Sequence, residues 1–193
     1  MSDMTALECL TTRNSCAKLT TPMPSERELE LVFQSALRAP DHARLRPWRF
    51  VSVSGDGLNA LSDLFVQYTR QQALEQGQAT LTQKQIDSAH AKGQRAPLVI
   101  AVVVCIKEHP KVPESEQILS AGAAAQNMLL ALHALGYQAI WRTGDLSRSE
   151  LARHTFALAS HEAIVALLYV GTASTALKPL PTLDVNEFVS SLS

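Results

Sequence analysis

The chain has 193 residues, of which 46% are hydrophobic, which is enough to bury one full core in a single domain over residues 1–193. Seventeen Lys and Arg residues against eighteen Asp and Glu residues leave a formal net charge of -1, so neither nucleic acid nor a membrane surface is an expected partner. Three cysteines without a Cys-x-x-Cys spacing fit a reducing compartment. The longest apolar run is too short to cross a bilayer, and we expect a cytoplasmic protein.

The N-terminal half of the chain is predicted to contain two amphipathic helices around one strand. A capping box begins at Ser25, and apolar residues then recur at helical spacing until Pro40. Residues 48–54 are β-formers, and residues 58–68 return to helical spacing. The polar stretch Gln71 to Gln94 is predicted to be helical, exposed and mobile, which makes it a candidate lid.

The C-terminal half contains the most apolar segments. Residues 98–106 and 163–170 are continuous apolar runs typical of strands buried on both faces. Between them, residues 115–135 are rich in Ala, Leu and Met and predict a buried central helix that ends at Gly136.

Three shorter features complete the C-terminal half. Residues 137–141 predict a short strand, and Ser147 with Glu150 has the spacing of a second capping box. Residues 172–193 form a proline-containing tail, predicted either to fray or to lie as an arm over a partner subunit. Strands separated by helices indicate an α+β or α/β domain with a three-layer arrangement, a central mixed sheet flanked by helices.

Familiar catalytic motifs are missing from the sequence. It has no G-x-G-x-x-G, P-loop, H-E-x-x-H or G-x-S-x-G pattern. Its six histidines lack the spacing of a metal site, so no metal is expected.

Three clusters place Arg or His beside small hydrogen-bonding residues at the edges of predicted elements. Arginine offers a planar fork of donors that suits phosphate and carbonyl oxygens, so the clusters together could hold a phosphorylated cofactor. Judged singly, each also has a structural interpretation as an ion pair, a helix C-terminal contact or a core residue. The N-terminal cluster is Arg13, Asn14 and Ser15; the second runs from Arg38 to His42; the third is Trp141, Arg142, Thr143 and Gly144.

The order of these clusters along the chain resembles the nitroreductase family of FMN flavoproteins, and within it the small YdjA-type members. The resemblance rests on R-N-S-C-A-K from Arg13, R-A-P-D-H with the later P-W, R-A-P-L-V-I-A-V-V from Arg95, and G-Y-Q-A-I-W-R-T-G from Gly136. It also includes the segment from His109 to Ala125 and ends near Gly171, so most of the chain takes part.

The resemblance implies an intertwined homodimer with two FMN sites, each lined by both subunits. By position, the flavin contacts would be Arg13, Asn14, Ser15, Arg38, His42, Trp141, Arg142, Thr143 and Gly144. The stretch associated with the nicotinamide nucleotide would be Ala131, Leu132, His133, Ala134, Leu135 and Gly136, although Leu132 and Leu135 equally fit a helix core. This sequence has Arg44 and Arg46 where the family commonly has Asn and Gln before Pro-Trp.

The implied activity is an FMN-dependent NAD(P)H oxidoreductase that reduces nitro-aromatic or quinone-type acceptors by a ping-pong mechanism. The flavin would carry the chemistry, so no catalytic residue or protein nucleophile is expected. Arg13, Lys18 and Arg142 are candidates to stabilise the reduced flavin. Two alternatives stay open: a specialised dehydrogenase or dehalogenase of the same fold, and a flavin-binding storage or sensor protein.

Overall fold

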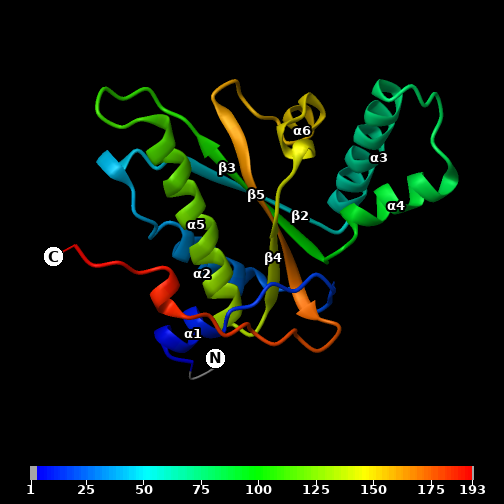
Figure 1. The fold of residues 1–193 in the computed structure, drawn as a ribbon. Coiled ribbons are helices and arrows are strands. Elements are labelled where there is room, and N and C mark those ends of the chain that lie inside the picture. Colours follow the sequence, from blue (N-terminus) through cyan, green and yellow to red (C-terminus); the bar gives the residue numbers. More distant parts are fainter. Residues whose placement is uncertain (1–3, 193) are drawn as a thin grey trace.

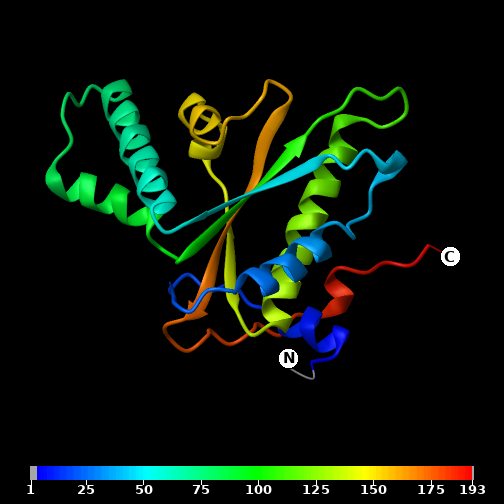
Figure 2. The same cartoon turned by 180° about the vertical axis from the view of Figure 1, so that it is seen from behind.

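A computed structural model describes residues 4–192, with a sheet between two layers of helices (Figures 1 and 2). In chain order the elements are α1 (Ala6–Thr12), β1 (Leu19–Thr20), α2 (Glu26–Ala36), the 3-10 turn η1 (His42–Arg44), β2 (Trp48–Ser54), α3 (Gly57–Glu75), α4 (Gln83–Gly93), β3 (Leu98–Cys105), α5 (Glu114–Ala134), β4 (Gln138–Arg142), η2 (Asp145–Arg148), α6 (Glu150–Thr155), β5 (Glu162–Ala173) and η3 (Val185–Glu187). The predicted α+β class is confirmed.

Strand β3 lies at the centre of the sheet between β2 and β5, while β1 and β4 also pair with β5. All pairings between these named strands are antiparallel. Outside these strands, Ser15 and Ala139 form an isolated parallel bridge. Strands β3 and β5 have partners on both edges and helices on both faces. This burial on all sides explains why their sequences are continuous apolar runs.

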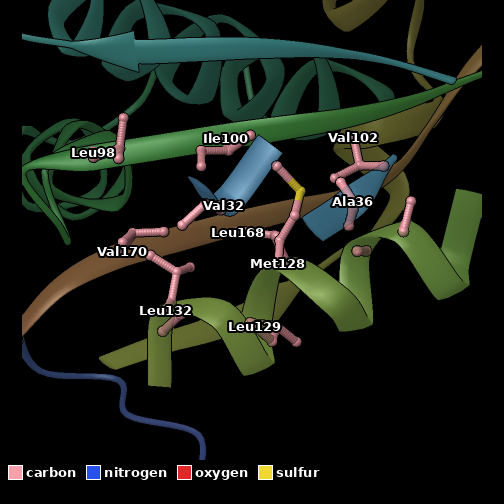
Figure 3. Close-up of a cluster of buried hydrophobic side chains, with 14 of the residues drawn as sticks. Val32, Ala36, Leu98, Ile100, Val102, Met128, Leu129, Leu132, Leu168 and Val170 are labelled. Atoms are coloured by element: carbon pink, nitrogen blue, oxygen red, sulfur yellow. The ribbon is translucent and has the colours of Figure 1, made fainter. Parts of the chain in front are cut away.

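Alternate side chains of β3 enter two separate cores. Leu98, Ile100 and Val102 point toward α2 and α5, where they meet Val32 and Met128 (Figure 3). The intervening residues of β3 point to the opposite face and pack with α3, α6 and the buried Tyr169. The sheet is therefore covered on both faces, as the three-layer prediction requires.

The start of α6 differs from the sequence prediction. Ser149, rather than Ser147, caps this helix, since its Oγ accepts the Ala152 N–H at 3.2 Å. Ser147 lies inside the 3-10 turn η2, where its Oγ donates to the Gly144 carbonyl at 2.7 Å. Ser147, which the capping-box spacing predicted as the helix cap, is therefore part of a tight turn before the helix.

The polar stretch Gln71 to Gln94 contains the end of α3, a turn at Gly77, and α4. These two helices form a hairpin that projects from the face of the sheet opposite α5 (Figure 1). Its role as a lid stays a prediction.

The segment after β5 is exposed along most of its length. Figures 1 and 2 show it passing α1 and the C-terminal end of α5 before it leaves the body of the molecule. Over the residues that the structure describes, no helix is both long and apolar enough to cross a membrane.

Candidate functional site

The first cluster begins where α1 ends. Thr5 and Glu8 form a capping box at the start of this helix, and Arg13 is its C-terminal cap. The helix packs on the last turns of α5, where Thr12 Oγ1 lies 2.9 Å from His133 Nε2. The chain then runs beside β4 and pairs Ser15 with Ala139. Arg13, Asn14 and Ser15 are therefore held between the C-terminal end of α5 and β4.

Asn14 connects this cluster to the C-terminal arm. Its Oδ1 accepts the Ser15 N–H at 2.8 Å, and its Nδ2 donates to the Lys178 carbonyl at 2.6 Å. The amide is thus engaged by the protein itself, whereas the Ser15 side chain is exposed.

The predicted nicotinamide stretch forms the last turn of α5 and the turn that follows. Leu132 is fully buried in the core, as its helical spacing allowed. Gly136 is exposed with φ of 88°, a left-handed conformation that ends the helix. Of this stretch, Ala131, His133, Ala134 and Leu135 are half-buried.

His133 links the stretch to the first cluster electrostatically. Burial, and after it the charge of Arg13, lower the pKa of His133 below its usual 6.5. Its Nδ1 is buried and has no hydrogen-bond partner within residues 4–192. A neutral ring with one unused nitrogen therefore lies beside Arg13.

The third cluster closes β4. Successive strand side chains point to opposite faces, so Trp141 lies over Gly122 of α5 while Arg142 points to the other side of the sheet. The Arg142 guanidinium lies 5.9 Å from the ring centroid of Tyr169. Arg142 Nε is buried and has no partner among the described residues. Thr143 and Gly144 are exposed at the strand exit that the sequence predicted.

The second cluster lies toward the other end of α5. Arg38 follows the C-terminus of α2 and is exposed, and His42 Nδ1 lies 2.7 Å from Glu116 Oε2 in the first turn of α5. From Glu116 to His133 the helix rises by about 25 Å. Within one subunit, the partner of His42 on α5 therefore lies far along the helix from His133, whereas the carbonyl of Ser35, three residues before Arg38, accepts from Asn127 Nδ2 in the middle of α5.

Sequence reasoning missed α1 and the contact between Thr12 and His133. The signal was present, because Thr5-Ala6-Leu7-Glu8 has the same capping-box spacing as the segment at Ser25. It also missed Tyr169, whose ring supports Arg142; burial raises the pKa of this phenol to about 12. No group of three or more metal-ligating side chains gathers within residues 4–192.

Comparison with known proteins decides the family. The profile described as "Nitroreductase family" matches residues 10–172. The chain belongs to the nitroreductase family. It is 38% identical to "Putative NAD(P)H nitroreductase YdjA" of Escherichia coli (strain K12), over 96% of this chain and 100% of that protein. A Haemophilus influenzae protein described in the same words, apart from the name YdjA, is 35% identical over 98% of this chain and 100% of its own length.

Solved structures agree with this family at the level of the fold. A nitroreductase-like family protein from Bacillus cereus superimposes with a TM-score of 0.79 at 21% identity and covers 100% of this chain and 98% of that one. A Bacteroides fragilis nitroreductase, solved with bound FMN, has a TM-score of 0.74 at 16% identity, with full coverage of both chains. The predicted nitroreductase-like fold is confirmed.

Proposed function

We propose that this protein binds FMN and works as an NAD(P)H-dependent oxidoreductase on nitro-aromatic or quinone-type acceptors. The observation that carries the proposal is that Ser15 of the first cluster pairs with Ala139 of β4, and β4 ends at Arg142 of the third cluster. Two groups of residues that match the family's flavin contacts therefore adjoin along one strand.

The residues fit FMN by their chemistry. Arg13 offers a charged fork for a phosphate, and Ser15 adds an exposed hydroxyl beside it. Arg142 would bring positive charge toward the flavin from β4, with the Tyr169 ring holding its guanidinium in place. Because the lowered pKa of His133 keeps its ring neutral, Arg13 supplies the positive charge at this position.

When bound, FMN supplies the redox chemistry, taking a hydride from a nicotinamide and passing electrons to a second substrate. The protein contributes position and electrostatics, and none of its side chains is required as a nucleophile. With one open face at the site, the two substrates would bind in turn, which is a ping-pong scheme. Flat acceptors suit such a face because they can stack on it.

We further propose a homodimer in which each site draws on both subunits. Arg13, Asn14 and Ser15 would come from one subunit and His42 from the other, because α5 separates His42 from the first cluster within a single chain. Arg38 belongs to the same matching motif as His42 and is assigned with it. Apolar side chains suited to a subunit interface are exposed on α5 and on the C-terminal arm: Ile118, Leu119, Leu183, Val185, Phe188 and Val189.

Titration with FMN followed by anaerobic addition of NADH or NADPH tests the proposal. We expect a yellow complex whose visible absorbance is lost on reduction and returns with a quinone. Arg13→Ala should weaken FMN binding by roughly 1.5–3 kcal/mol, about one to two decades in affinity, because it removes a charge-assisted contact. Arg44→Ala serves as the matched control, since this residue lies outside the matching motifs.

Each outcome separates the alternatives left by the sequence. Bound flavin that neither nicotinamide reduces would replace the enzyme with a storage or sensor protein. Reduction without turnover of any quinone or nitro compound would favour a specialised dehydrogenase or dehalogenase. A wild-type protein that binds no FMN would overturn the proposal.

A further inference from the structure

His133, in the last turn of α5, is held in one tautomer by its contact with α1. The Thr12 hydroxyl donates its single hydrogen to the Glu8 carbonyl at 2.6 Å, and the same oxygen lies 2.9 Å from His133 Nε2. Nε2 must therefore carry the hydrogen of this contact and donate it to Thr12. In the neutral ring, Nδ1 is then the unprotonated nitrogen and can only accept.

The surroundings of Nδ1 favour this neutral ring as long as no anion is bound nearby. Nδ1 is buried, and none of the residues that the structure describes gives it a hydrogen bond. Arg13 directly follows Thr12, the residue that touches the ring. Burial first, and then the charge of Arg13, lower the pKa of His133. A proton on Nδ1 would therefore be repelled by the guanidinium and would lack an acceptor.

The other charged groups of the elements around this end of α5 do not offset Arg13. Glu8 of α1 is bonded within its own capping box, and Glu28 of α2 is bonded to its capping serine and to a phenol. Lys178 is exposed on the C-terminal arm. Residues 129–135 of α5 include no charged side chain besides His133 itself. Arg13 is therefore the charge that acts on the imidazole.

A phosphate monoester at Arg13 would reverse this balance. It carries a charge of about −1.5 to −2 at neutral pH, which is more than one guanidinium can neutralise. The negative charge cancels the repulsion by Arg13, and a phosphate oxygen can accept the N–H that protonation of Nδ1 creates. An imidazolium at His133 would then supply the second positive charge.

We propose that binding of the FMN phosphate at Arg13 draws a proton from solvent onto His133 Nδ1, so that cofactor and proton bind cooperatively. The inference rests on the proposed function, because it gives His133 a role at the phosphate end of that same site. The coupling is reciprocal: the factor by which FMN raises the proton affinity of His133 is also the factor by which that proton raises the FMN affinity.

An NMR titration of the imidazole signals tests the coupling directly. FMN should raise the midpoint of His133 by about one pH unit, a tenfold gain in proton affinity. The exposed His90 of α4 is the internal control and should not shift. Riboflavin at the same concentration should leave the His133 midpoint unchanged, since it lacks the phosphate.

The pH dependence of FMN affinity tests the reciprocal effect, with His133→Gln as the variant because its amide can still donate to Thr12. Wild-type protein should gain up to about tenfold in affinity over the variant as the pH falls from about 7.5 to 5.5. Ionisation of the phosphate itself affects both proteins equally and cancels in this ratio. Circular dichroism confirms that the variant is folded.

Three results would overturn the inference and leave the proposed function standing. One is a His133 midpoint that FMN leaves unchanged or lowers. Another is an upward shift that riboflavin reproduces, because the phosphate would then not be its cause. The third is a constant ratio of FMN affinities between wild type and His133→Gln across this pH range. Wild-type protein that binds no FMN would instead overturn the proposed function.

Discussion

Arg13 and His133 are coupled although 120 positions separate them in the chain. Burial is the larger cause of the lowered pKa of His133, and the Arg13 charge is the second. Arg13→Ala should therefore raise the pKa of His133 without restoring its usual 6.5, since burial remains. A titration of the imidazole signals by NMR measures the change, with Arg27→Ala as an exposed control on α2. An unchanged midpoint would mean that the two side chains do not interact.

Arg142 and Trp141 differ in what each should contribute to flavin binding. Arg142→Gln removes the charge beside Tyr169 and should weaken FMN binding roughly tenfold. Trp141→Phe keeps an aromatic ring over Gly122 and should have a smaller effect. FMN titration of the apo-proteins measures both, with circular dichroism to confirm folding. Wild-type affinity and reduction in Arg142→Gln would remove the third cluster from the site.

Contacts between residues that are far apart in the sequence could not be predicted from the sequence. Capping boxes and helical spacing act over three or four residues, and they correctly placed α2 and the end of α5 at Gly136. The contact between Thr12 and His133 joins residues 121 positions apart, and that between His42 and Glu116 spans 74. Only the packing of α1 and η1 on α5 sets these pairs, and local patterns do not encode it.

Among the elements, β5 is tied to its neighbours through Glu162. This carboxylate accepts two hydrogen bonds from Arg49 of β2 at 2.8 Å, one from the Ala159 N–H at 3.0 Å and one from Cys105 Sγ at 3.2 Å. Arg49 above all lowers the pKa of Glu162 from 4.5 to about 2. The ionised form is therefore preferred in the folded protein.

This preference predicts an acid-sensitive stability. Because the folded pKa is below the unfolded one, the stabilisation is complete above pH 4.5 and is lost as the pH falls toward 2. Glu162→Gln should cost roughly 1.5–3 kcal/mol at neutral pH and flatten the stability profile across this interval. Urea unfolding at several pH values measures it. A variant as acid-sensitive as wild type would place the titrating group elsewhere.

Helices and strands that are buried on nearly all sides were predicted correctly, whereas the start of α6 was not, because a tight turn sets where that helix begins. Strand β3 and helix α5 were predictable because their apolar sequences match burial on nearly all sides. Ser147 and Ser149 both lie close before α6, and the structure uses the later one because η2 comes first. The two-residue strand β1 has too little sequence to carry a pattern.

At the scale of the whole molecule, the exposed apolar side chains of α5 and the arm predict a strong subunit interface. Phe188 is 71% exposed, and Leu119 on α5 is equally so. Such surface is rarely left open to water by a monomer, so dilution should not yield a folded monomer. Sedimentation across a dilution series measures this. A stable monomer at micromolar concentration that keeps its FMN would contradict the shared sites.

The proposed assignment of the first and second clusters to different subunits also leads to a genetic prediction. If Arg13 of one subunit and Arg38 of the other serve the same site, Arg13→Ala and Arg38→Ala protomers form a heterodimer with one undamaged site and one doubly damaged site. Either homodimer would carry two singly damaged sites. Two defective alleles expressed together should then complement each other, restoring up to about a quarter of the wild-type FMN sites under random pairing. Alleles that fail to complement would place both arginines in one subunit's site.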